Sequence, residues 1–217
     1  MVKIHILGGS GSGKTTLASD IAARLSIPHY ELDTFGSKNG ANDAAYIEDA
    51  FSIASQPSWV TEGIFLIWTE PLLYHANYIV LYEVPWTTAA WRIIFRHINK
   101  SLRGINPYPG FNGLKLLFKL LKDTRNHCLS REITDPTILE YQRLYLEGQR
   151  EPADLLDAEY ILVRLKKYFP VVFAPTAAFV HQYLMPYKHK VVLIRTNADR
   201  KRFLARIDAL SQHNSSV

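Results

Sequence analysis

The chain has 217 residues, 47% of them hydrophobic, so it can bury a full core and does not belong to the disordered class. Its single cysteine, Cys128, excludes an internal disulfide, and no group of Cys and His has the spacing of zinc ligands. No run approaches the roughly 18 apolar residues of a membrane span, and an apolar run begins almost at the N-terminus. We therefore expect a cytoplasmic protein with no transmembrane segment and no structural metal.

Positive charge is concentrated in one segment. Nine Lys or Arg residues lie between Arg92 and Arg131 against one acid, Asp123, so this segment carries +8 while the whole chain carries +5. The rest of the chain is therefore slightly acidic. A segment this basic is expected to face an anionic partner.

The first predicted elements surround a glycine-rich motif. The apolar run from Val2 to Leu7 predicts a buried strand, and the stretch from Thr15 to Leu25 predicts a helix. Between them, GGSGSGKTT fits G-x-x-x-x-G-K-[ST], in which glycines allow a tight wrap around phosphate and the helix directs its positive dipole end at the anion. The motif predicts a nucleotide-binding loop made of Gly8, Gly9, Ser10, Gly11, Ser12, Gly13, Lys14, Thr15 and Thr16.

Two residues of this loop have individual roles. Lys14 is expected to reach the β- and γ-phosphates, and the Thr15 hydroxyl is the expected Mg²⁺ ligand. The sequence thus predicts ATP and Mg²⁺ as the bound cofactors, and it does not distinguish ATP from GTP.

Strands and helices then alternate along the chain. Alternation of this kind is typical of a parallel sheet covered on both faces, so we expect an α/β fold: a five-stranded parallel P-loop NTPase core with three α/β/α layers. The further expected strands are His29 to Leu32, Trp59 to Thr61, Tyr78 to Tyr82 and Lys190 to Ile194, and the further expected helices are Asp43 to Ala54 and Thr87 to Ser101.

The middle of the chain has a different pattern. Two prolines and three glycines between Gly104 and Gly113 predict a loop, and mainly helical sequence then runs to about Tyr168, with interruptions near Asp135-Pro136 and Glu151-Pro152. We expect one P-loop kinase-like domain over residues 1–217, with a helical lid region inserted at about 104–170.

Two acidic residues are expected at the carboxyl edge of the sheet, where ligands of open α/β sheets bind. Asp33 follows the second strand and is placed to orient an acceptor hydroxyl or take its proton, although Asp also caps helices and turns. Glu62 follows the third strand, before Gly63, and is the candidate to support Mg²⁺. A helix N-cap is the alternative role for Glu62.

Basic residues supply the remaining candidates. Arg92 and Arg96 share a helix face and are suited to neutralise charge on a transferring phosphoryl group. We expect Trp91, Ile93, Ile94 and Phe95 to anchor this helix in the core and so to fix its polar face in position. The alternative is a solvated basic face. After the last strand, Asn197 is placed to contact an adenine base, although a polar loop entering a helix explains this segment equally well.

The stretch LKLLFKLLK predicts a basic amphipathic helix. Lys115, Lys119 and Lys122 share one face, and Leu114, Leu117, Phe118 and Leu121 share the other. Such a helix can lie on an anionic membrane or along nucleic acid, but packing of its apolar face against the core is the commoner arrangement and is what we expect.

These motifs together resemble those of adenylate-kinase-like P-loop proteins, and within them the group of DNA topology modulation proteins. The likeness rests on the P-loop, IPHYELD, WVTEGIF, YIVLYEV and WRIIFRH, and covers about residues 1–103 and 186–210. It implies a five-stranded parallel core, ATP with Mg²⁺ and an arginine-bearing lid. GGSGSGKTT, LDTF and EGIF also look like uridine kinase, although Gly36 stands where that family has Tyr.

The sequence therefore predicts a P-loop kinase that transfers the γ-phosphoryl group of ATP to a small acceptor bearing a hydroxyl or phosphate. The alternative is an ATP-binding regulatory protein that docks on nucleic acid or membrane through its basic insertion. Nucleic acid is the less favoured partner, because no aromatic-and-glycine RNA signature is present. Neither the acceptor nor the oligomeric state can be derived from the sequence.

Overall fold

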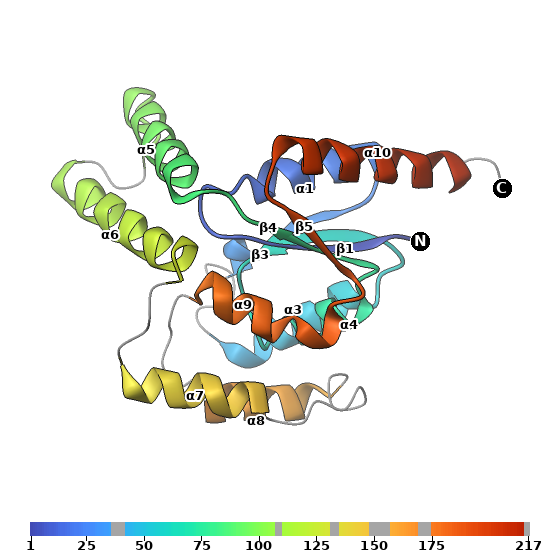
Figure 1. The fold of residues 1–217 in the computed structure, drawn as a ribbon. Coiled ribbons are helices and arrows are strands. Elements are labelled where there is room, and N and C mark those ends of the chain that lie inside the picture. Colours follow the sequence, from blue (N-terminus) through green and yellow to red (C-terminus); the bar gives the residue numbers. More distant parts are fainter. Residues whose placement is uncertain (36–41, 107–109, 131–134, 148–156, 169–174, 215–217) are drawn as a thin grey trace.

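The computed structural model describes residues 1–35, 42–106, 110–130, 135–147, 157–168 and 175–214. Its core is a parallel five-stranded sheet with the order β2-β3-β1-β4-β5 (Figure 1). The fold predicted from the sequence is confirmed. The strands are β1 (Lys3–Leu7), β2 (His29–Glu31), β3 (Trp59–Gly63), β4 (Tyr78–Tyr82) and β5 (Val191–Ile194).

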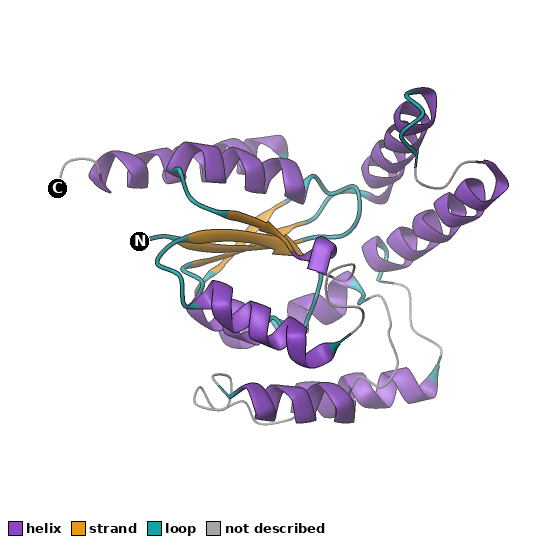
Figure 2. Cartoon of the chain, turned by 180° about the vertical axis from the view of Figure 1, so that it is seen from behind, coloured by secondary structure: helices purple, strands orange, loops and turns teal. Residues whose placement is uncertain are grey.

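Helices cover both faces of this sheet, as Figure 2 shows from behind. Side chains alternate along each strand, so β1 sends Ile4 and Ile6 into one apolar cluster and Leu7 into another. The first cluster lies under α1 (Lys14–Leu25) and α10 (Asn197–Asn214). The opposite face is covered by α3 (Asp43–Ala54), α4 (Glu70–His75) and α9 (Ala177–Tyr183).

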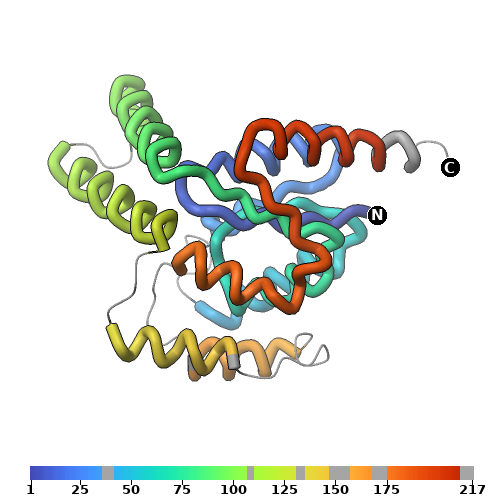
Figure 3. Tube along the Cα trace, in the orientation of Figure 1, coloured from blue at the N-terminus to red at the C-terminus, as the bar shows by residue number. Residues whose placement is uncertain are grey.

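Four described helices form two pairs, and the first pair joins the helix just before the insertion to the first helix within it. Helices α5 (Trp86–Leu102) and α6 (Gly110–Cys128) contact each other and stand beyond the carboxyl edge of the sheet, whereas α7 (Pro136–Glu147) and α8 (Ala158–Tyr168) lie outside the layer formed by α3 and α9 (Figures 1 and 3). Short 3₁₀ helices, η1 (Leu32–Thr34) and η3 (Met185–Tyr187), complete the described elements.

The loop expected from Gly104 to Gly113 ends earlier in the structure than the sequence predicted. Helix α6 already begins at Gly110, so the last four of these residues are helical. The interruption near Asp135 is confirmed, because the Asp135 carboxylate accepts a hydrogen bond from Thr137 N at 2.9 Å where α7 begins. The interruption expected at Glu151-Pro152 lies outside the described residues.

A buried carboxylate connects the insertion to the core. Glu70, at the start of α4, is 2% exposed and accepts hydrogen bonds from three tyrosine hydroxyls. Tyr145 of α7 and Tyr183 of α9 donate to Oε1 at 2.7 Å and 2.5 Å, and Tyr187 of η3 donates to Oε2 at 2.8 Å. Because a buried charge is costly unless it is hydrogen-bonded, these elements are held in a fixed relation to α4.

Candidate functional site

The loop between β1 and α1 has a backbone that its glycines make possible. Gly11 and Gly13 have φ of +76° and +99°, in the region that side chains disfavour. A Cβ at Gly8 would lie 2.8 Å from Tyr82 O, and one at Gly11 would lie 2.7 Å from Ala89 O. Since β4 and α5 approach the loop this closely, larger residues at these two positions would displace it.

Four of the predicted site residues converge beside this loop. Lys14 Nζ lies 3.5 Å from Glu62 Oε2 at the end of β3 and 3.7 Å from Asp33 Oδ2 in η1. The Thr15 hydroxyl donates to Glu62 Oε1 at 2.8 Å. The site thus combines a cation, a hydroxyl and two carboxylates at the end of the sheet where α1 begins.

The two carboxylates have different surroundings. The Asp33 side chain is 58% exposed, whereas the Glu62 side chain is 1% exposed. Buried Oε2 of Glu62 makes no hydrogen bond and has only the ion pair with Lys14. An acceptor left buried in this way is suited to a cation or its water, and oxygen donors are what Mg²⁺ prefers, so Thr15 and Glu62 fit a magnesium site.

Neither Glu31 nor His29 was among the site residues predicted from the sequence. The register of β2 on β3 places Glu31 opposite Glu62, and alternation along β2 puts His29 on the same face. One ligand atom each from His29, Glu31 and Glu62 lie within 4.8 Å of one another. The acid at Glu31, two positions before Asp33 at the end of the same expected strand, was the signal in the sequence.

Arg92 contacts the loop itself. Its Nη1 donates to the carbonyl oxygens of Gly11 at 3.1 Å and of Ser12 at 2.6 Å. Arg96 lies one turn further along α5 and is exposed. The expectation that four apolar residues anchor α5 is wrong for two of them, because Trp91 and Phe95 are exposed and only Ile93 is buried.

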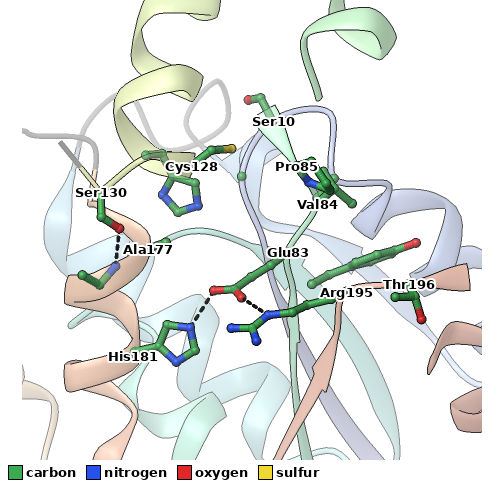
Figure 4. Close-up of a pocket in the computed structure, with 15 residues that line it drawn as sticks. Ser10, Glu83, Val84, Pro85, Cys128, Ser130, Ala177, His181, Arg195 and Thr196 are labelled. Carbon is green, nitrogen blue, oxygen red and sulfur yellow. Dashed lines mark hydrogen bonds and ion pairs between the residues drawn. The ribbon is translucent and has the colours of Figure 1, made fainter. Parts of the chain in front are cut away.

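A cavity of about 640 Å³ adjoins the loop on the side of β4 and β5 (Figure 4). Gly9, Ser10 and Ser12 line one side of it, and the end of α6 and the start of α9 line another. His127 of α6 packs against Gly9, where a Cβ would meet its ring at 2.8 Å. Burial lowers the pKa of His127, which favours the neutral ring.

Polar side chains from three parts of the chain meet at this cavity. Glu83, just after β4, pairs with His181 Nε2 of α9 at 2.6 Å and with Arg195 Nε after β5 at 2.9 Å (Figure 4). Sequence reasoning missed all three, since they are far apart along the chain. Arg195 and Thr196 line the cavity, while Asn197 is exposed on the first turn of α10 and is not among the lining residues.

No described helix is both long enough and apolar enough to cross a lipid bilayer.

Comparison with known proteins adds only distant likenesses. No family model matches the sequence, and no curated protein matches it. A putative kinase from Chloroflexus aurantiacus J-10-fl is 20% identical, with a TM-score of 0.35, over 54% of this chain and 77% of that one. Shikimate kinase from Acinetobacter baumannii, solved with shikimate, is 17% identical, with a TM-score of 0.37, over 78% of this chain and 95% of that one.

A second shikimate kinase, from Bacteroides thetaiotaomicron, is 15% identical over 76% of this chain and 95% of that one, with a TM-score of 0.33. Likeness at this level carries no argument about activity or substrate. The resemblance to DNA topology modulation proteins and to uridine kinase stays a prediction.

Proposed function

We propose that this chain is a Mg²⁺-dependent kinase that transfers the γ-phosphoryl group of ATP to a small acceptor bearing a hydroxyl or phosphate. One observation carries the proposal. Side chains from three elements meet beside a glycine loop whose backbone angles suit it to phosphate: Lys14 and Thr15 of α1, Asp33 of η1 and Glu62 of β3.

Each residue has a role in this proposal. The amides of residues 8–16 and Lys14 hold the phosphates, and the start of α1 adds its positive dipole end. Thr15 and Glu62 would hold Mg²⁺, which supplies neutralising charge between the phosphates when it is bound. Catalysis is then mainly positioning and charge neutralisation.

Asp33 is proposed to receive the acceptor. Its carboxylate is exposed to an incoming molecule yet lies 3.7 Å from Lys14 Nζ. A carboxylate there can hold an acceptor hydroxyl in line with the phosphoryl group and accept its proton. Arg92 and Arg96 are proposed to meet the charge that develops during transfer, and Asn197 to contact the base.

The test is a screen of small acceptors by ADP release. Lys14→Ala should abolish turnover, whereas Asp33→Asn should keep ATP affinity and lower turnover at least ~100-fold, because it loses the proton acceptor. Lys201→Ala and Glu48→Gln change an exposed Lys of α10 and an exposed Glu of α3 and are the matched controls.

The outcomes separate the parts of the proposal. Full turnover in Asp33→Asn would show that this carboxylate is not the acceptor base. Calorimetry that detects no heat with any magnesium-nucleotide complex would remove the proposed function as a whole. ATP binding without release of ADP for any acceptor would favour a regulatory nucleotide-binding protein.

A further inference from the structure

Large apolar side chains are exposed together on one part of the molecule. Helices α5 and α6 and the start of their connection carry nine of the fifteen large hydrophobic residues that are exposed within the described ranges. Exposed apolar groups that are scattered singly are ordinary, but a cluster of this size marks an interaction surface. The nine are Trp91, Phe95, Ile98, Leu102, Ile105, Phe111, Leu114, Leu116 and Phe118.

On α5 these side chains form one continuous stripe. Trp91, Phe95, Ile98 and Leu102 follow the spacing i, i+4, i+7 and i+11, which places them on one helix face. Their exposed fractions are 66%, 53%, 47% and 81%, and the rings of Trp91 and Phe95 stack with centroids 6.1 Å apart. This face of α5 is therefore apolar along three turns and has no core beneath it.

Helix α6 repeats the arrangement. Phe111, Leu114 and Phe118 share a face and are exposed, so the expectation that Leu114 and Phe118 pack against the core is wrong. The expected basic face is exposed too, with Lys115, Lys119 and Lys122. Helices α5 and α6 contact each other and project away from the sheet (Figure 3).

The net charge of this region indicates which class of partner can bind it. From Trp86 to Cys128 the chain has eight Lys or Arg and one acid, Asp123. A second copy that met this surface with its own would bring like charges together, which opposes association. The partner should instead be anionic and also offer an apolar phase, since the exposed residues include long aliphatic side chains that cannot stack on bases as aromatic residues do.

We propose that the exposed faces of α5 and α6 form a docking surface for anionic phospholipid membranes. The aromatic and aliphatic side chains enter the boundary between headgroups and acyl chains, and Lys115, Lys119 and Lys122 lie at the level of the lipid phosphates. This surface goes beyond phosphoryl transfer and does not depend on it. It attaches the protein to one leaflet without crossing the bilayer.

The test uses the full chain and vesicles of phosphatidylcholine, prepared with and without phosphatidylserine. Co-sedimentation should show binding only when phosphatidylserine is present, and the binding should weaken steeply as salt is raised. The double variant Phe95→Ser with Phe118→Ser should bind at least ~10-fold more weakly, because two inserted rings are lost. The matched control is Leu139→Ser, at an exposed position on α7.

A second set of variants tests the charges without touching the proposed kinase residues. Replacing Lys115, Lys119 and Lys122 together by Gln should weaken vesicle binding at low salt and flatten its dependence on salt. Lys166→Gln, on α8, should leave both unchanged. All of these side chains are exposed, so circular dichroism and the melting temperature should stay those of the parent, which excludes misfolding as the cause.

Several results would overturn the proposal. Equal binding to both vesicle types, or to neither, would do so. The proposal would also fail if the protein bound duplex DNA or single-stranded RNA but no vesicles, and if the Phe95 and Phe118 changes weakened that nucleic-acid binding. A dimer in sedimentation that these changes dissociate would identify a second copy as the partner. ADP release without vesicles should be the same in all variants, so the failure of this proposal is distinguishable from failure of the proposed kinase.

Discussion

Glu62 is the buried member of the candidate site, and its two oxygens have different neighbours. Oε1 accepts from the Thr15 hydroxyl and Oε2 faces Lys14. Glu62→Gln keeps the shape of the side chain and removes its charge. If Glu62 supports the metal, the Mg²⁺ concentration that gives half-maximal ADP release should rise roughly tenfold.

The control for this change is Glu48→Gln, at an exposed position on α3. An unaltered Mg²⁺ dependence in Glu62→Gln would assign the carboxylate to positioning Lys14 and Thr15 only.

Arg92 and Arg96 were predicted as a pair, but their surroundings differ. Arg92 donates to two carbonyl oxygens of the glycine loop, so Arg92→Gln should loosen the loop and weaken ATP binding by roughly tenfold, the effect of lost charge-assisted hydrogen bonds at a partly exposed site. Arg96→Gln should leave ATP affinity unchanged and lower turnover. Calorimetry and ADP release measure the two quantities, and equal losses of affinity would contradict this division.

Burial of His5 should make the stability of the folded protein depend on pH. It is fully buried in β1, its Nδ1 hydrogen-bonds to the Thr61 hydroxyl at 2.7 Å, and burial lowers its pKa from 6.5 to about 3. Between these values the unfolded chain binds a proton that the folded chain does not, so stability is complete above pH 6.5 and is lost as the pH falls. The loss should be roughly 2 kcal/mol between pH 6.5 and 5.

Urea unfolding at the two pH values measures this loss. His127, whose pKa burial also lowers, contributes in the same direction, so the parent should keep part of the slope when His5 is changed. In His5→Gln the free energy of unfolding should depend less on pH than in the parent. The same pH dependence in both proteins would show that His5 is not the cause.

At the scale of elements, hydrophobic periodicity was enough to predict the bounds of an element that is long or buried on both faces. The bounds of α3 and β4 match those predicted, and β1 and α1 differ by one residue. Two short helices, α4 and α9, were missed, because helices of six and seven residues depend on tertiary packing rather than on their own propensity. Helix α6 starts early because glycine and proline lower helix propensity without forbidding a first turn.

Periodicity could not show what an apolar face packs against. The apolar residues of α5 and α6 follow helical spacing, which in a globular protein usually faces a core. Trp91 and Phe118 are exposed because these two helices project from the sheet. The pattern predicted the helices correctly and their packing incorrectly.

The close approach of α5 to the glycine loop gives a prediction for Gly11. A Cβ there would lie 2.7 Å from the backbone oxygen of Ala89, and φ is +76°. Gly11→Ala should therefore displace the loop and remove measurable ATP binding. Gly104→Ala is the matched control, because Gly104 also has positive φ, +66°, but nothing lies within 4 Å of its would-be Cβ.

The expected cost at Gly104 is about 1 kcal/mol from the backbone alone, with ATP binding retained. Comparable ATP affinity in both variants, measured by calorimetry, would show that the loop tolerates a side chain facing α5.

At the scale of the whole molecule, topology explains which parts of the site were predictable. Lys14 and Thr15 begin a helix, Asp33 follows a strand and Glu62 lies near the end of one, and parallel strands bring those positions to one edge. Glu83, His181 and Arg195 meet across 98 and 112 positions of sequence, with no motif that links them. Their cavity depends on where α6 and α9 come to lie, which residue spacing does not determine.

A substitution in the Glu70 cluster tests how the insertion is held on the core. Its three tyrosine donors come from α7, α9 and η3, so the cluster connects parts of the chain up to 117 positions apart. Tyr187→Phe removes one donor to the buried carboxylate and should lower the free energy of unfolding by about 1–3 kcal/mol, measured in urea. ATP affinity should not change, because Tyr187 lies outside the candidate site.

Tyr141→Phe is the control, since Tyr141 is on α7 and only half-buried. If Tyr187→Phe costs no more than Tyr141→Phe, the hydrogen bonds to Glu70 contribute nothing net, and apolar packing of Tyr145 and Tyr183 must hold the insertion. If it instead weakens ATP binding, the insertion and the glycine loop are coupled through α9, whose first residues line the cavity beside the loop.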